Sequence, residues 1–338
     1  MNILVTGGIG YIGSHTIIEL LKDSNNQIIV IDNLINSRIE IKDIIEEISM
    51  RNIKFYNIDL TDFNGINEVF NNEDIDSVIH FAALKAVGES VEKPLEYYNN
   101  NIIGTLNLLI AMKKHNVKKF IFSSSATVYG DSDIMPVYEE LPIMTATNPY
   151  GRTKTMIEDI LRDIYISDRS WDIVLLRYFN PVGAHESGLI GELPNGIPSN
   201  LMPYISKVAD GELDYVRVFG NDYDTPDGTG VRDYIHVVDL AKGHVSAMKK
   251  LKNGSGLNTY NLGTGQGYSV LEIINAFSKA SSKKIPYKIV DRRAGDIATS
   301  YANPSKAKNE LGWCAEKSLE DMCKDFWKWQ CIGMKNFK

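Results

Sequence analysis

The sequence predicts an α/β fold, a doubly wound parallel sheet followed by a smaller C-terminal α/β lobe. Short apolar runs alternate with helical periodicity through the first half of the chain, which is typical of strand–helix–strand units with right-handed crossovers. After about residue 180, prolines and glycines divide the pattern into short pieces. We therefore expect one domain over residues 1–180 and a second over 181–338, with an approximate boundary and room for the chain to return to the first domain.

Six apolar segments are the expected strands of this sheet: residues 2–6, 27–31, 53–57, 77–81, 119–123 and 172–177. Between them, three amphipathic segments predict helices: Ile12–Lys22, Asn99–His115 and Tyr150–Ile166. Apolar residues on one side of each helix would cover a face of the sheet.

Composition excludes several classes of protein. With 338 residues, 43% of them hydrophobic and 23% charged, the chain is an ordinary globular one. Its formal net charge of −7 disfavours nucleic acid and anionic membranes as partners, and no apolar run approaches the roughly 20 residues of a membrane span. The three cysteines and six histidines show no spacing typical of a disulfide framework or a metal site. Because the apolar first strand follows Met1 without a basic leader, we expect a cytoplasmic location.

A glycine-rich turn joins the first expected strand to the first expected helix. It runs from Gly7 through Gly10 to Gly13 and includes Tyr11 and Ile12. Small residues keep such a turn tight and let backbone N–H groups approach a pyrophosphate at the positive end of the helix. This pattern in this context predicts a dinucleotide site.

Strand ends supply further candidate contacts to a dinucleotide. Asp32 ends the second strand, where a carboxylate accepts hydrogen bonds from ribose hydroxyls and favours NAD over NADP. Asp59 follows the third strand, where it could reach the adenine amine; a turn or a helix cap suits this residue equally well. Phe81 and Ala82 come at the end of the fourth strand, where small residues such as Ala82 let the backbone pass close to a cofactor. The alternative is that small residues there only allow a helix to pack closely on the sheet.

Tyr150 and Lys154 lie four residues apart, just after Asn148-Pro149 at the start of an expected helix. Their spacing places both on the face that carries the apolar stripe, an unusual position for a lysine. Ser125 ends the fifth strand, at the sheet edge where ligands bind. The structural alternatives are that Tyr150 and Lys154 form an ordinary surface pair and that Ser125 caps a helix or forms a turn. With a dinucleotide fold, the three residues indicate proton abstraction from an alcohol with hydride transfer to a nicotinamide.

These residues resemble the extended short-chain dehydrogenase/reductase family. Within it, residues 123–130 (SSSATVYG), 177–185 (RYFNPVGAH) and 230–236 (GVRDYIH) look like the UDP-glucose 4-epimerase family. The resemblance covers nearly the whole chain. It implies that residues 1–180 form an NAD-binding Rossmann domain and that residues 181–338 bind a UDP-sugar.

The resemblance also implies an activity, the interconversion of UDP-glucose and UDP-galactose through transient oxidation at sugar carbon 4. Tyr150 would take the proton of the 4-hydroxyl with help from Ser125, while Lys154 would hold the nicotinamide ribose and lower the pKa of the tyrosine. The 4-keto sugar would turn and recover the hydride on its other face. A homodimer, joined through the Asn99 and Tyr150 helices, is implied as well.

Further site residues are carried over position by position. On the NAD side they are Asn33, Leu60, Lys85, Asn100, Ser123 and Tyr178. On the UDP-hexose side the arginines would clamp phosphates, Phe219 would pack by the uracil and Asp296 would accept from the ribose. That set comprises Ser125, Asn180, Asn200, Phe219, Arg232, Arg293, Asp296 and Ser300. Where some members carry a bulky tyrosine, this chain has Ser300, which suggests that UDP-GlcNAc and UDP-GalNAc are also accepted.

Two other functions compete with this interpretation. A sugar-nucleotide 4,6-dehydratase shares the first oxidation, but it needs an acid and a base where this chain has Ala126 and Thr127. A non-catalytic nucleotide-sensing protein would typically lack the tyrosine or the lysine, and this chain keeps both.

Overall fold

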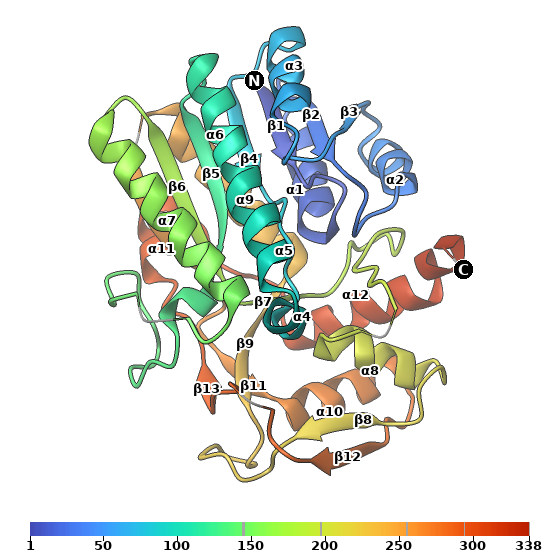
Figure 1. Cartoon of the computed structure of the whole chain (residues 1–338). Coiled ribbons are helices and arrows are strands. Elements are labelled where there is room, and N and C mark those ends of the chain that lie inside the picture. The colour runs from blue at the N-terminus through green and yellow to red at the C-terminus, as the bar shows by residue number, and fades with distance from the viewer. Residues whose placement is uncertain (144–145, 197, 255, 294, 338) are drawn as a thin grey trace.

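The computed structural model describes residues 1–143, 146–196, 198–254, 256–293 and 295–337. A large parallel sheet carries helices on both faces, and a smaller lobe lies beyond the carboxyl ends of its strands (Figure 1). This architecture confirms the predicted fold class. Among the described residues, no helix is both long and apolar enough to cross a membrane.

The large sheet has seven strands, and all its pairings are parallel. In spatial order they are β10 (Leu257–Leu262), β6 (Asp172–Tyr178), β5 (Lys119–Ser125), β4 (Ser77–His80), β1 (Asn2–Thr6), β2 (Gln27–Asp32) and β3 (Lys54–Asn57). All six expected segments form strands, with ends that shift by at most two residues. The seventh strand, β10, comes from the C-terminal half, so the chain re-enters the large sheet after leaving it.

Alternate residues of each strand enter opposite cores, as a sheet buried on both faces requires. Ile3 and Val5 of β1 pack with α1 (Tyr11–Leu21), α2 (Glu40–Ser49) and α9 (Val237–Lys252). Leu4, between them, packs on the other face. The helices on that face are α3 (Phe63–Asn72), α6 (Gly104–Lys114) and α7 (Pro149–Ser167), with α4 (Val87–Glu92), α5 (Pro94–Tyr98) and a π-helical turn (Asn99–Ile103) beside them.

The smaller lobe surrounds a third core that includes Phe277, Phe326 and Trp329. Its helices are α8 (Leu201–Ala209), α10 (Val270–Ser281) and α12 (Leu319–Cys331); α11 (Ser305–Leu311) packs beside β10. Its strands are β7 (Asn180–Val182), β9 (Val231–His236), β11 (Gly267–Ser269) and β13 (Thr299–Ser300) in one sheet and β8 (Val216–Phe219) with β12 (Tyr287–Val290) in another. Within the described residues, 3-10 turns also lie at Ala126–Tyr129, after β5, and at Gly333–Phe337, after α12.

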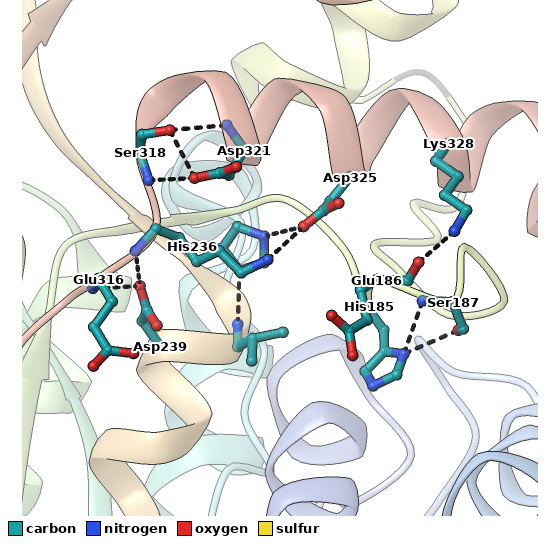
Figure 2. Close-up of polar contacts among 12 residues, drawn as sticks. His185, Glu186, Ser187, His236, Asp239, Glu316, Ser318, Asp321, Asp325 and Lys328 are labelled. Atoms are coloured by element: carbon teal, nitrogen blue, oxygen red, sulfur yellow. Dashed lines mark hydrogen bonds and ion pairs between the residues drawn. The ribbon is translucent and has the colours of Figure 1, made fainter.

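A buried histidine joins the two lobes. Figure 2 shows His236, at the end of β9, directed at Asp325 of α12, with 3.2 Å between Nε2 and Oδ2. Its Nδ1 accepts the N–H of Val238 at the start of α9, so Nε2 carries the proton and donates it to the carboxylate. A side chain on Gly183 would meet the same imidazole ring at 2.8 Å. The histidine thus holds α12 against the segment that leaves the large sheet.

Candidate active site

The glycine turn adopts the close geometry that its composition predicts. Gly7 has φ +67°, and a Cβ there would lie 2.7 Å from the backbone nitrogen of Ala82. A Cβ on Gly13 would lie 2.4 Å from the Gly7 carbonyl oxygen. Only glycine fits at these two positions. Gly10 is the N-cap of α1, whose first turn contains no acidic side chain, so its N–H groups remain free to bind an anion.

A cavity of about 600 Å³ lies at this turn and runs along the carboxyl ends of the strands. Most of the residues expected to contact the cofactor line it. They are Gly7, Gly10, Tyr11, Ile12, Gly13, Asp32, Asn33, Leu60, Phe81, Ala82, Lys85, Asn100, Ser123, Tyr150, Lys154 and Tyr178. Of the expected substrate residues, Asn200 lines the same cavity.

The acidic residues at the adenosine end differ in their surroundings. Asp32 is buried, which raises the pKa of its carboxyl, and its Oδ1 accepts from Ser37 at 2.7 Å. Asp59 lies outside the cavity lining. Its Oδ1 accepts from the hydroxyl and N–H of Thr61, and its Oδ2 accepts from Asn33 at 2.7 Å. Asp59 therefore forms a turn and also orients Asn33, which does line the cavity.

Helix α7 brings Tyr150 and Lys154 to the other end of the cavity. Asn148 is its N-cap and accepts the N–H of Gly151 at 2.9 Å, and Pro149 occupies the first position. The Lys154 ammonium lies 5.8 Å from the centre of the Tyr150 ring. It donates to the carbonyl oxygen of Ser123 at 2.7 Å. Lys154 is only 3% exposed, so this lysine does point inward.

Burial perturbs both groups in the direction of their neutral forms. It raises the pKa of Tyr150 to about 12, while a hydrogen bond with Ser125 acts in the opposite direction. It lowers the pKa of Lys154 to about 7, opposed by the negative charge of Glu158. Perturbed pairs that line a cavity are typical of catalytic sites. A phenol here needs a nearby cation to ionise, and Lys154 is that cation.

Tyr178 and Ser123 close the cavity beside this pair. Tyr178 of β6 and Ser123 of β5 lie on neighbouring strands, two positions apart in register, and their hydroxyl groups are hydrogen bonded. Burial raises the pKa of Tyr178 far above its usual range, so its phenol stays protonated. It contributes shape and a neutral hydroxyl rather than a base.

Several expected substrate residues gather in the smaller lobe, outside the cavity lining. The Arg293 guanidinium lies over the Phe219 ring, 4.7 Å from its centre, and donates to Asp296 with 2.9 Å between Nε and Oδ2. Arg232 and Ser300 are paired neighbours on β9 and β13. The charges of Arg232, Arg293 and Asp296 all act on the buried phenol of Tyr234. Three sequence-distant segments thus form one cluster.

Asn180 is exposed on β7 and makes no hydrogen bond with this cluster that the described residues display. Asn200 instead meets a residue that sequence reasoning missed. The carboxylate of Glu192 is buried in the cavity wall and accepts from Lys85 at 3.1 Å and from Asn200 at 2.9 Å. It links the expected cofactor side to the expected substrate side. No local motif marks Glu192, because its partners come from other segments.

Comparisons with known proteins identify the family. Residues 4–326 match the family model described as GDP-mannose 4,6 dehydratase. The UDP-glucose 4-epimerase of Bacillus subtilis (strain 168) is 58% identical over 338 residues, which is 100% of this chain and 99% of that protein. The chain belongs to the UDP-glucose 4-epimerase family.

Solved structures of UDP-glucose 4-epimerases match the whole fold. The enzyme from Bifidobacterium longum, in complex with NAD+ and UDP, is 57% identical with a TM-score of 0.95 and 98% of each chain covered. The enzyme from Stenotrophomonas maltophila, with bound NAD and formylated UDP-arabinopyranose, is 50% identical with a TM-score of 0.97 over 100% of both chains. The resemblance expected from the sequence motifs is confirmed.

Proposed function

We propose that the protein interconverts UDP-glucose and UDP-galactose as an NAD-dependent isomerase. The observation that carries this proposal is the buried Tyr150–Lys154 pair, which lines the same cavity as the glycine turn. Family membership selects epimerisation among the oxidations that such a pair can start. Dehydration is disfavoured because Ala126 and Thr127, which follow Ser125, offer no acid or base.

The residues of the cavity fit NAD. The glycine turn and the free start of α1 suit a pyrophosphate, and Asp32 offers a carboxylate for the adenosine ribose. Lys154 and Tyr178 stand where the nicotinamide end would lie. When bound, NAD supplies a reversible acceptor for the hydrogen on sugar carbon 4.

The side chains on α7 and β5 move the proton. Tyr150 takes it from the sugar 4-hydroxyl, and Ser125, hydrogen bonded to the phenol, orients that hydroxyl. The ammonium of Lys154 stabilises the phenolate so that a phenol with a raised pKa can act near neutral pH. Inversion would be completed when Tyr150 returns the proton to the oxygen of the 4-keto group while carbon 4 receives hydride on its opposite face.

The smaller lobe holds the nucleotide. Arg232 and Arg293 offer planar forks for the pyrophosphate, Phe219 an aromatic face for the uracil, and Asp296 an acceptor for the uridine ribose. Because these contacts are to the UDP part, the hexose remains free to turn within the site. That freedom is what inversion at carbon 4 requires.

The activity is tested by incubating the purified protein with UDP-galactose, without added NAD, and measuring UDP-glucose. We expect conversion to an equilibrium mixture and release of NAD when the protein is denatured. A product lacking the elements of water would identify a dehydratase. Absence of any product, with NAD present in the protein and UDP bound, would identify a nucleotide-sensing protein.

We further propose that N-acetylated UDP-hexosamines are substrates, because Ser300 adds little bulk beside Arg232. Ser300→Tyr should then remove activity on UDP-GlcNAc and spare activity on UDP-glucose. A wild-type protein that turns over UDP-glucose but not UDP-GlcNAc would refute the idea.

Dimerisation through the helices beside α7 is part of the same proposal. Large apolar side chains are exposed there, on α4, α5, the π-helical turn, α6 and α7: Val87, Val91, Leu95, Ile103, Ile110, Met156 and Ile166. Such a patch on one face suits an isologous contact between two copies. Sedimentation should give a mass twice that of one chain, and the Leu95→Glu variant should give the mass of a single chain.

The location is proposed separately. Free thiols at Cys314, Cys323 and Cys331 suit a cytoplasmic location.

A further inference from the structure

A buried carboxylate lies one helical turn beyond Lys154 on α7. The side chains of Glu158 and Arg177 are 0% and 2% exposed. Arg177, from β6, donates two hydrogen bonds to the Glu158 carboxylate, from Nε to Oε1 at 2.9 Å and from Nη2 to Oε2 at 2.6 Å. The Ser124 hydroxyl donates to Oε1 at 2.5 Å, and Arg162 donates to Oε2 at 2.7 Å. Four donors therefore hold one carboxylate in a single orientation.

This carboxylate completes a row of contacts between α7 and the end of β5. The helix contributes three side chains at successive turns, and the strand contributes three successive residues. Because the three side chains belong to one helix, a shift of the helix at one contact would move the other two. The row ends at the cavity, so such a shift would reach the tyrosine–lysine pair. The pairs are Tyr150 with the Ser125 hydroxyl, Lys154 with the Ser123 carbonyl, and Glu158 with the Ser124 hydroxyl.

We propose that Glu158, held by Arg177 and Ser124, is a positioning residue that fixes α7 on β5 so that Tyr150 and Lys154 meet the reacting centre. It lies outside the cavity lining and holds the two residues in place through the helix. The inference rests on the proposed function of the tyrosine–lysine pair. It assigns a role to a charged cluster that substrate and cofactor do not touch.

The same carboxylate also acts on Lys154 through its charge. Near this ammonium the described residues also place Tyr150 on its own helix, His80 of β4 and, through their shared neighbour Ser123, Tyr178 of β6. The guanidinium groups of Arg177 and Arg162 pair with Glu158 itself. His80 is buried with its pKa lowered to about 3, and both phenols have raised pKa values, so these three groups are neutral near pH 7. Glu158 is the negative charge that favours the protonated lysine.

The deciding variant is Ser124→Ala, because it keeps both charges of the buried pair and removes one tether. We expect kcat to fall on the order of tenfold to a hundredfold and KM to stay within about twofold, since the helix shifts while UDP contacts persist. Ser281→Ala is the matched control: its buried hydroxyl on α10 bonds the Phe277 carbonyl, remote from the site. Equal kcat values for Ser124→Ala and wild type, or an equal fall in both variants, would overturn the proposal.

The pH profile of kcat separates positioning from simple destabilisation. Glu158→Gln should move the alkaline limb to lower pH by about one unit, because Lys154 then loses its proton more easily. Arg162→Gln, which changes a partly exposed partner of the carboxylate, should move that limb to higher pH and leave the fold intact. If the alkaline limb of the kcat profile stayed at the same pH in Arg162→Gln, the charge of Glu158 would not be coupled to the protonation of Lys154.

These outcomes are distinguishable from a failure of the proposed function. If the wild-type protein does not epimerise UDP-galactose, the function itself is wrong. If the wild type is active and Tyr150→Phe is not, while Ser124→Ala matches the wild type, only the positioning role of Glu158 is lost.

Discussion

The two charged clusters of the site differ in how they are held. Around α7, the ion pair of Glu158 with Arg177 is 0% and 2% exposed and lies between a long helix and central strands. In the smaller lobe, Arg293 and Asp296 are 53% and 23% exposed and lie in a connection between short strands. The ion pair of the first cluster is buried and held by several hydrogen bonds. The second is open to water and to incoming phosphate.

This difference assigns different tasks to the two ends. Proton transfer demands fixed geometry, so it belongs where packing and hydrogen bonds determine every side chain. Binding a pyrophosphate demands cations that can exchange an internal partner for the ligand, as Arg293 can exchange Asp296. Substitutions at the α7 end should therefore alter kcat, and substitutions at the smaller lobe should alter KM.

The largest expected effect comes from Tyr150→Phe, which removes the proton acceptor. Turnover should fall by roughly a hundredfold to ten-thousandfold, whereas UDP should bind with nearly unchanged affinity because its contacts lie in the other lobe. Steady-state kinetics and calorimetric titration with UDP measure the two quantities. Tyr287→Phe, at an exposed tyrosine of β12, is the control. A variant with near-normal turnover would reassign the base to Ser125 or to water.

The opposite pattern is expected for Arg293→Leu. Losing a hydrogen bond to a charged group costs about 1.5–3 kcal/mol, so KM should rise roughly tenfold to a hundredfold with kcat little changed. Arg292→Leu removes the same charge from the neighbouring position, where the guanidinium pairs with Asp222, and should leave KM near the wild-type value. If Arg293→Leu lowered kcat alone, the division of tasks between the two ends would be wrong.

The smallest effect concerns the stability of the nucleotide-free protein. The pKa of Lys154 is lowered to about 7, so above that pH the unfolded chain binds a proton that the folded protein does not. Stability should therefore rise with pH from about 7 towards the ordinary lysine value near 10.4. Lys154→Met should reduce this rise by about 1 kcal/mol per pH unit, measured by urea unfolding at pH 7 and pH 8. Equal slopes in the two proteins would show that the lysine is not desolvated.

Local periodicity was sufficient to predict the large sheet. Apolar strands such as β1 and β5 can be recognised from five to seven residues, and α7 begins at a proline that follows an asparagine cap. The smaller lobe gave no comparable signal. Its strand β13 has two residues and β11 has three, and their pairing with β9 depends on tertiary contacts. The return of β10 to the large sheet is likewise a long-range event.

The site follows the same division. Tyr150 and Lys154 could be predicted because their relation is a helical spacing, and Asp32 because it ends a strand. The grouping of Phe219, Arg232 and Arg293 could be expected only from family resemblance, since three distant segments form it. Neither Glu192 nor Glu158 was predicted as a site residue. For Glu158 the sequence did offer two signals, an arginine within the apolar run of β6 and a glutamate eight residues after Tyr150.

The central claim is that carbon 4 of the sugar is oxidised and reduced again within one site by the protein's own NAD. The most direct test is to supply UDP-galactose carrying deuterium at carbon 4, without added NAD, and to analyse the UDP-glucose by mass spectrometry. Our account predicts that the deuterium stays on carbon 4 and that no hydrogen from solvent enters there. Loss of the label to water would contradict it.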